Sequence, residues 1–214
     1  ASEDLAVAKM RAGREAGGDE VELFVEVHGR LAPSDAIRVA NRLEEFRPFF
    51  YEEPVPPQNL EALKKVSDNV NIPIATGERL LTKFDFADLL PLHAVDLIQP
   101  DVVQAGGILE LKKIAAMAEP YEINVAPHNF YGHLCTMMNA HFAAATPNLR
   151  IMETDIDRIP WDQELFTNVP KIRDGHLIIP DKPGWGTEPD EEALRSRPPI
   201  KARGLTDQHK AAYA

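Results

Sequence analysis

Short apolar runs alternate with amphipathic segments along most of this chain. The amphipathic segments have apolar residues at three- and four-residue spacing, which is typical of helices with one buried face. They predict helices at 3–16, 33–46, 59–69, 82–90, 106–120 and 133–146. The short runs close near a proline, a glycine or an ionisable residue. They predict strands at 21–27, 47–54, 72–78, 94–100, 121–128 and 148–154.

Six alternations of strand and helix, with strands too apolar to face water, predict a parallel sheet covered by helices. One ionisable residue recurs at or just past each strand end: Glu26, Glu52, Glu78, Asp101, His128 and Glu153. Their steps of 23 to 27 residues match one strand–helix unit each, as on the catalytic face of a (β/α) barrel. An open sheet would concentrate such residues at one switch point, and the glycine-rich nucleotide-binding motifs are absent from the sequence.

Six strands are too few to close an eight-stranded barrel. The expected fold class is therefore α/β, a TIM barrel of the (β/α)7β type. It is expected to be incomplete, with about six parallel strands present and two missing before residue 1. Residues 1–165 are expected to form the partial barrel that carries the metal-binding and catalytic site. Residues 155–175 are predicted to be irregular, 174–194 to hold a short strand and about one helical turn, and 195–214 to form a polar tail.

Composition narrows the class of partner. Asp and Glu number 34 against 23 Lys and Arg, for a formal net charge of −11, which argues against nucleic acid or an anionic membrane as the main partner. The single cysteine, Cys135, cannot form an internal disulfide, which fits a reducing compartment. The sequence has no signal peptide and no apolar run near the length of a membrane span. A cytoplasmic location is therefore expected, and the helical pattern at the first residues suggests a fragment.

Three strand-end glutamates form a candidate metal site. Glu26, Glu52 and Glu78 offer oxygen ligands of the kind that Mg²⁺ prefers. A single glutamate is most often only a solvated surface residue. Glu52 and Glu78, however, adjoin apolar strands, where an unpaired carboxylate would be unfavourable. Glu53 points the other way in an extended strand and is interpreted as structural.

Two histidines are the candidate proton carriers. In an extended strand, His28 lies on the same side as Glu26, so one strand end would present a carboxylate and an imidazole together. His128 is the second carrier, and Asp101 on the preceding strand could accept a proton from its ring and fix its tautomer. Glu153 on the next strand could donate a hydrogen bond when protonated. The remaining histidines are assigned structural roles: His93, His133, His141 and His176.

The order and spacing of these motifs resemble a known family. The series VEVHGR, YEEP, TGER, IQPD, AGG, APH, MET and DGHLIIPDKPGWG, from about residue 3 to about residue 195, resembles the barrel domain of the enolase superfamily, mandelate racemase subgroup. Within that subgroup it is most similar to sugar-acid dehydratases of the D-galactonate dehydratase kind. A Lys or His base beside Mg²⁺ is general for this superfamily.

The resemblance implies roles for the candidate residues. Glu26, Glu52 and Glu78 would bind Mg²⁺, and His128 paired with Asp101 would be the general base. His28 would be the general acid, and Glu153 would hydrogen-bond the developing enediolate. The implied reaction removes the proton alpha to the carboxylate of an aldonate such as galactonate and eliminates the 3-hydroxyl, giving a 2-keto-3-deoxy acid. The implied partner is this small-molecule substrate, and the full-length form is expected to be a homo-oligomer.

The chain departs from the family pattern in two respects. It carries Glu26, one methylene longer, where those dehydratases carry Asp. The family's N-terminal capping domain and first two barrel strands are absent from the 214 residues, so substrate specificity is not readable from this chain. Residues 166–214 are expected to comprise the last strand region and a C-terminal extension that packs back on that capping domain. Two alternatives stay open: a racemase or epimerase of a 2-hydroxy acid on the same scaffold, and a non-catalytic fragment.

Overall fold

Five short parallel strands form the central sheet of the computed structural model, which describes residues 2–156, 159 and 161–197. Their order in the sheet is the order of the chain, β1-β2-β3-β4-β5, and every pairing is parallel. The strands are β1 (Phe24–Glu26), β2 (Phe50–Glu52), β3 (Ile74–Thr76), β4 (Leu97–Ile98) and β5 (Asn124–Val125). The predicted α/β fold with a parallel sheet is confirmed.

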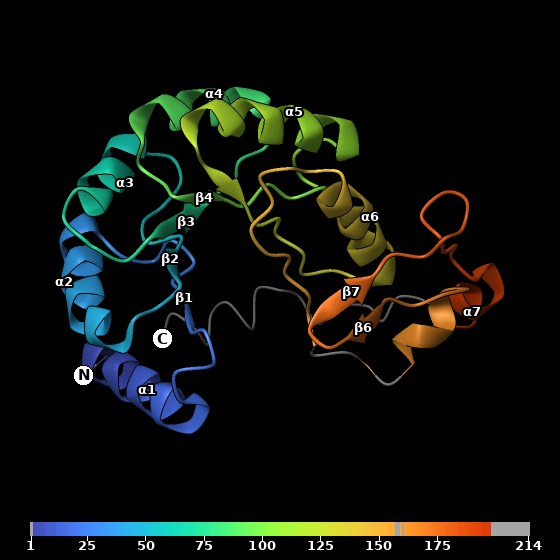
Figure 1. The fold of residues 1–214 in the computed structure, drawn as a ribbon, viewed down its shortest axis with the longest axis horizontal. Coiled ribbons are helices and arrows are strands. Elements are labelled where there is room, and N and C mark those ends of the chain that lie inside the picture. The colour runs from blue at the N-terminus through green and yellow to red at the C-terminus, as the bar shows by residue number, and fades with distance from the viewer. Residues whose placement is uncertain (1, 157–158, 160, 198–214) are drawn as a thin grey trace.

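Four helices connect consecutive strands, and together with one helix before β1 and one after β5 they form an arc outside the sheet (Figure 1). They are α1 (Ser2–Gly17), α2 (Pro33–Leu43), α3 (Leu60–Ser67), α4 (Lys83–Leu89), α5 (Ile108–Ala118) and α6 (His133–Ala144). All six lie where the apolar spacing predicts a helix. Among the described residues, no helix combines the length and apolarity needed to cross a bilayer.

Local sequence signals set the helix ends. The Thr82 hydroxyl accepts a hydrogen bond from the Phe84 amide at the start of α4, as its position predicts. At their other ends, α2, α4 and α5 each continue as a 3₁₀ turn: η1 (Glu44–Phe46), η2 (Leu90–Leu92) and η3 (Glu119–Tyr121). Each turn ends at a left-handed residue, which redirects the chain towards the next strand.

The core lies between the outer face of the sheet and the helices. Strand residues alternate between the two faces, so Tyr51, Ile74 and Ile98 point outwards into this core and are almost completely buried. The strand residues next to these in sequence point to the inner face of the sheet. They form a second, smaller apolar cluster that includes Phe50 and Leu97. Beyond this cluster, towards the carboxyl ends of the strands, the next residues on the inner face are the strand-end residues.

The prediction of a sixth strand at 148–154 is wrong. Only Leu149 in this segment pairs with the sheet, through one isolated bridge. Leu149 pairs with Val125 in parallel, with hydrogen bonds from the Val125 amide to the Asn148 carbonyl (2.9 Å) and from the Arg150 amide to the Val125 carbonyl (2.8 Å). The physical reason is that β5 is only two residues long and offers no further partners. The Glu153 carbonyl bonds a side chain instead of a neighbouring strand.

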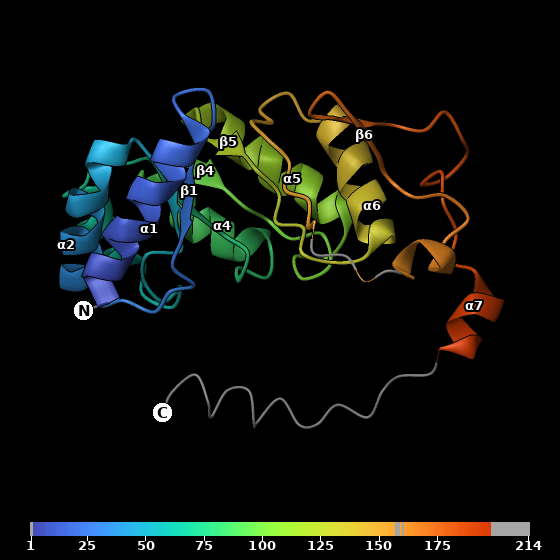
Figure 2. The same cartoon turned by 90° about the horizontal axis from the view of Figure 1, so that it is seen from below.

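After residue 155 the chain adds a 3₁₀ turn η4 (Asp162–Leu165), an antiparallel hairpin of β6 (Lys171–Arg173) and β7 (His176–Ile178), and α7 (Glu191–Ser196). Figures 1 and 2 show the hairpin beside α6. The prediction of an irregular 155–175 segment is wrong at η4 and β6. The signal it overlooked is Asp174-Gly175, whose positive φ angles of 50° and 73° make a tight hairpin turn. β7 and α7 match the predicted strand and helical turn, and residues 198–214 of the predicted tail lie outside the described residues.

Two phenylalanines on α4 test the packing of the outer layer. Phe86 is fully buried in the core, whereas Phe84, two residues earlier, is 68% exposed. Phe86→Ala should lower the free energy of unfolding by about 3–5 kcal/mol, because it leaves a cavity. Phe84→Ala should change it by about 1 kcal/mol or less. Urea unfolding of both variants measures the difference, and equal losses would contradict this assignment of the helix faces.

Candidate active site

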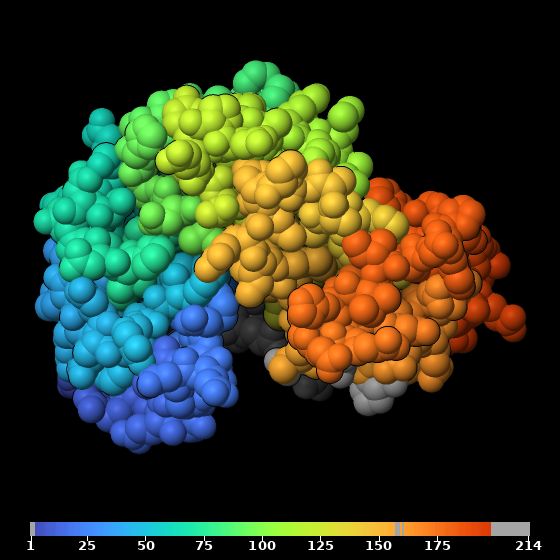
Figure 3. Space-filling view, in the orientation of Figure 1, coloured from blue at the N-terminus to red at the C-terminus, as the bar shows by residue number. Residues whose placement is uncertain are grey.

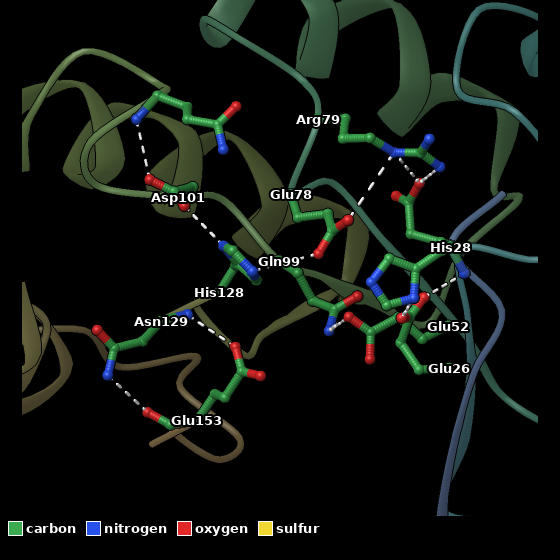
Figure 4. Close-up of polar contacts among 12 residues, drawn as sticks. Glu26, His28, Glu52, Glu78, Arg79, Gln99, Asp101, His128, Asn129 and Glu153 are labelled. Atoms are coloured by element: carbon green, nitrogen blue, oxygen red, sulfur yellow. Dashed lines mark hydrogen bonds and ion pairs between the residues drawn. The ribbon is translucent and has the colours of Figure 1, made fainter. Parts of the chain in front are cut away.

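The innermost layer of the site comes from the inward-facing residues at the ends of the strands. Glu26 and Glu52 are directly opposed in the register of β1 and β2. Gln99 follows β4 and points to the same side, where its Nε2 donates to Glu52 Oε1 at 2.7 Å. Figure 4 shows these side chains together with Glu78 on the loop after β3. The strand order thus brings together carboxylates that are 26 residues apart in sequence.

Glu52 is the most strongly perturbed carboxylate of the group. Its side chain is buried, and burial raises its pKa to about 7; repulsion from Glu153, Glu78 and Glu53 adds to the rise. The hydrogen bond from Gln99 acts in the opposite direction and does not overcome these effects. Glu52 is therefore a buried acid with negative neighbours and no paired cation within the described residues, a state that a positive charge would relieve.

Glu26 and His28 lie together, but the geometry of an extended strand does not explain it. β1 ends at Glu26, and His28 and Gly29 have positive φ angles of 54° and 60°, so the chain turns at once. The Glu26 carboxylate accepts from the His28 backbone amide and pairs with His28 Nδ1. The sequence predicted that Glu26 and His28 point to the same side of an extended strand. That explanation is wrong, because a turn after Glu26 brings the two side chains together.

His128 lies between two carboxylates. Its Nδ1 is 2.6 Å from Asp101 Oδ2, and its Nε2 is 3.3 Å from Glu78 Oε2 (Figure 4). Burial by itself would lower the His128 pKa, but the hydrogen bond to Asp101 and the charges of Glu153 and Glu78 outweigh it and raise the pKa. An Nδ1–H that donates to Asp101 leaves Nε2 as the nitrogen that exchanges a proton with a substrate.

Asp101 is held firmly in this arrangement. It is fully buried, and its Oδ1 accepts from the backbone amides of Val103 at 2.7 Å and Gln104 at 2.9 Å. Burial would raise the Asp101 pKa, but hydrogen bonds from His128, the Gln104 amide and Tyr131 together lower it. The carboxylate therefore stays ionised and keeps one oxygen for the imidazole.

Glu153 enters the site from the segment that follows the Leu149 bridge. Its Oε2 accepts from the Asn129 backbone amide at 2.7 Å, one residue after His128. The carboxylate is also close enough to Glu52 and His128 to shift the pKa of each. All seven predicted site residues therefore lie in one group, with Glu26 and His28 on one side and His128 and Asp101 on the other (Figure 4).

Residues assigned to structural roles lie outside this group. Glu53 is fully buried and accepts from Thr76 Oγ1, the Gly77 amide at 3.0 Å and Arg79 Nε at 2.9 Å. The four remaining histidines contact other elements: His93 packs on Tyr121, His133 lies 3.2 Å from Asp162, His141 packs on Trp185, and His176 Nδ1 contacts the Asp174 carbonyl.

Sequence reasoning overlooked Gln99, Asn129 and Tyr131. Each bonds or orients a predicted site residue. Gln99 carries the one detectable signal, since it lies at a strand end directly before the Pro100-Asp101 pair. Asn129 and Tyr131 follow His128 in a loop, where nothing in the local pattern distinguishes them from ordinary turn residues.

The residues fit a divalent cation without forming a ready-made site. In the described part of the chain, no group of three His, Cys, Asp or Glu side chains could hold a metal ion as it stands. Each predicted ligand bonds a protein partner instead: Glu26 to His28, Glu52 to Gln99, and Glu78 to His128. Burial and the neighbouring carboxylates raise the pKa of Glu52, so a cation beside it would be favourable, and the carboxylate oxygens are ligands that suit Mg²⁺.

A cavity of about 380 Å³ opens on the inner side of the sheet. Its polar end is formed by Glu52, Gln99 and Glu153, and its apolar end by Phe24 and Phe50. On the face shown in Figure 3 the molecule is notched between the α1–α2 region and the segment that carries β6 and β7.

A parallel sheet in sequential strand order, with helices outside it and ionisable residues at its carboxyl end, resembles part of a (β/α) barrel enzyme domain. More specifically, the chain belongs to the enolase C-terminal domain-like family, whose model matches residues 2–193. The fold resembles the barrel domain of the enolase superfamily, as expected from the motifs.

Curated relatives of the chain are sugar-acid dehydratases. It is 37% identical over 193 residues to D-xylonate dehydratase of Haloferax volcanii, covering 90% of this chain and 47% of that protein. It is 38% identical over 178 residues to D-gluconate/D-galactonate dehydratase of Picrophilus torridus, covering 83% and 45%. The chain spans about half the length of these relatives.

Solved structures agree in fold. A mandelate racemase/muconate lactonizing enzyme of Jannaschia sp. CCS1 superposes with a TM-score of 0.88 at 36% identity, covering 94% of this chain and 51% of that one. A Burkholderia xenovorans protein described as an L-alanine-DL-glutamate epimerase, solved with magnesium and fumarate bound, gives 0.88 at 43% identity, covering 95% and 50%.

The Glu52 pKa predicts how stability depends on pH in the metal-free protein. Between its ordinary pKa of 4.5 and about 7, the folded state holds this proton more tightly than the unfolded state. The free energy of unfolding should therefore fall by roughly 3 kcal/mol as pH rises through that window. Glu52→Gln should remove this contribution, whereas the exposed Glu45→Gln should keep it. Urea unfolding from pH 4 to 8 in a chelating buffer measures it, and parallel curves for wild type and Glu52→Gln would refute it.

Proposed function

We propose that this chain is the catalytic barrel domain of a Mg²⁺-dependent sugar-acid dehydratase. The substrate is an aldonate such as galactonate, and the product is the 2-keto-3-deoxy acid. The observation that carries the proposal is the placement of two histidines on opposite sides of the carboxylate cluster: His128 with its Asp101 partner, and His28 with Glu26. A dehydratase needs a base and an acid at different atoms of one substrate.

His128 is the proposed base. Its Nδ1 is committed to Asp101 at 2.6 Å, so Nε2 takes the proton from the carbon alpha to the substrate carboxylate. That proton is very weakly acidic, and its removal places negative charge on the substrate carboxylate oxygens. Glu153, when protonated, donates a hydrogen bond to this developing enediolate, since it lies beside His128 at the cavity wall.

His28 is the proposed acid. Its side chain is 64% exposed and pairs with Glu26 beside the other carboxylates (Figure 4), and in this proposal it protonates the departing 3-hydroxyl. The turn at His28 and Gly29 directs the imidazole back onto Glu26. Glu26 thereby has two functions in this proposal, as metal ligand and as the partner that orients the acid.

Glu26, Glu52 and Glu78 are the residues that would hold the metal. Bound Mg²⁺ would supply positive charge next to the substrate carboxylate and so favour removal of the alpha proton. Support comes from the charge deficit at Glu52 and from the magnesium bound to the Burkholderia xenovorans relative.

The proposal includes the setting of this domain. β1 to β5 supply successive strands of a (β/α)7β barrel, and the remaining strands and a capping domain are not among the residues of this chain. Residues 1–165 belong to that barrel, and 166–214 form an extension towards the capping domain. We place the enzyme in the cytoplasm as a homo-oligomer. The relatives, of which this chain spans about half, support its being one part of a longer protein.

A second candidate function is epimerisation of a 2-hydroxy acid. The 43% identity to the protein described as an L-alanine-DL-glutamate epimerase favours it. An epimerase forms the same enediolate but returns a proton to C2 from the opposite face. His28 next to Glu26 favours dehydration, because an acid placed there can reach a leaving group.

The division of roles between the histidines predicts different defects. In the full-length protein, His128→Asn should reduce both solvent deuterium exchange at C2 and elimination by about 10³-fold or more, because the base is lost. His28→Asn should reduce elimination by about 100-fold and leave exchange within a few-fold of wild type. NMR of substrate in D₂O measures both. The exposed His176→Asn serves as control, and equal losses of both reactions in His28→Asn would contradict the assignment.

Metal binding by the three glutamates is testable without turnover. Isothermal titration of the full-length protein with Mg²⁺ should show binding. Glu52→Gln and Glu78→Gln should each weaken it by about tenfold or more, because even residues that only orient ligands contribute 10–100-fold. Glu45→Gln, on the outer surface, should bind as wild type does. Absence of Mg²⁺ binding, or unchanged affinity in both site variants, would exclude this ligand set and favour a non-catalytic domain.

A further inference from the structure

Glu153 stands on a segment that the sheet does not hold. The last backbone hydrogen bond between this segment and a strand is the one from the Arg150 amide to the Val125 carbonyl. A carboxylate that acts on a developing charge must nevertheless be placed within a few tenths of an ångström. Another contact must therefore determine where Glu153 lies.

Asn129 makes that contact from both its backbone and its side chain. Its backbone amide donates to Glu153 Oε2 at 2.7 Å, and its Nδ2 donates to the Glu153 carbonyl at 3.0 Å. The first bond orients the carboxylate, and the second fixes the backbone that carries it. Asn129 is fully buried and directly follows His128, so one residue connects the proposed base to Glu153.

Helix α6 in turn fixes the Asn129 side chain. Nδ2 donates to Thr136 Oγ1 at 3.1 Å, and Oδ1 accepts from Asn139 Nδ2 at 3.1 Å. Thr136 and Asn139 are three residues apart on one face of α6, and both are fully buried. Because the Glu153 carbonyl can only accept, the amide orientation of Asn129 is determined.

We infer that Asn129 is a positioning residue for Glu153, and that Thr136 and Asn139 on α6 hold Asn129 in place for this role. The inference rests on the proposed function, in which Glu153 hydrogen-bonds the enediolate. It extends that function to three residues outside the proposed metal ligands and proton carriers. Helix α6 thereby couples the loop that carries His128 to the segment that carries Glu153.

Thr136→Val and Thr136→Ser form a matched pair for the test. Valine keeps the shape but removes the oxygen that Asn129 bonds, whereas serine keeps the oxygen. In the full-length protein, Thr136→Val should lower kcat about tenfold with little change in KM, and Thr136→Ser should stay near wild type. Ala140→Gly, elsewhere on α6, should lower stability without loss of kcat. A crystal structure of Thr136→Val should show the Glu153 carboxylate displaced.

A double-mutant cycle separates positioning from general damage. If Thr136 acts through Glu153, Thr136→Val should cause no further loss of kcat in a Glu153→Gln background. An equal loss in both backgrounds, or wild-type kcat in folded Thr136→Val, would overturn the inference while Glu153→Gln remains impaired. Wild-type kcat in Glu153→Gln would instead refute the role of Glu153 in the proposed function, and this inference with it. Asn139→Leu, which removes the other bond to Asn129, provides the same comparison if Thr136→Val does not fold.

Discussion

Buried negative charge at the carboxyl end of the sheet is the constraint on which the rest of this structure depends. Parallel strands in sequential order necessarily bring their carboxyl ends together, so residues about 26 positions apart become neighbours. Here those residues are mostly carboxylates. Burial and mutual repulsion raise the pKa of Glu52 to about 7, which means that the folded chain holds this group at a free-energy cost.

Polar groups from other elements partly offset the free-energy cost of burying these carboxylates. Gln99 bonds Glu52, His128 lies between Asp101 and Glu78, and the backbone amide of Asn129 bonds Glu153. Glu53 shows the contrasting solution, since Arg79, Thr76 and the Gly77 amide satisfy it completely on the outer side of the strand. Among the described residues no cation pairs with Glu52, and Arg79 only reaches the edge of the inner group, with 3.9 Å between its Nε and Glu78 Oε1. This asymmetry makes the inner group a candidate for Mg²⁺ and leaves the outer one structural.

The outer layer supplies the rigidity that such a site needs. Helices α2 to α5 pack on the sheet through a continuous apolar core, so the strand ends keep their relative positions. The site itself is built from loops and turns that depend on this scaffold: the turn at His28, the loop after Asp101, and the loop from His128 to Tyr131. Side chains within these loops then orient one another, as Asp101 does with His128.

The local pattern of the sequence was sufficient for the alternation of strands and helices, the positions of all six helices before residue 146, and the recurrence of ionisable residues at strand ends. These features depend on periodicity and on short-range capping signals such as Thr82. The turn that joins Glu26 to His28, the loss of the sixth strand after Leu149, and the anchoring of Glu153 by Asn129 were decided only by tertiary structure. Each of these depends on which donor lies closest to a given acceptor in space. The closest donor is sometimes on a residue distant in sequence, and sometimes it is brought close by a turn that interrupts the two-residue period of a strand. The spacing of apolar residues encodes neither of these.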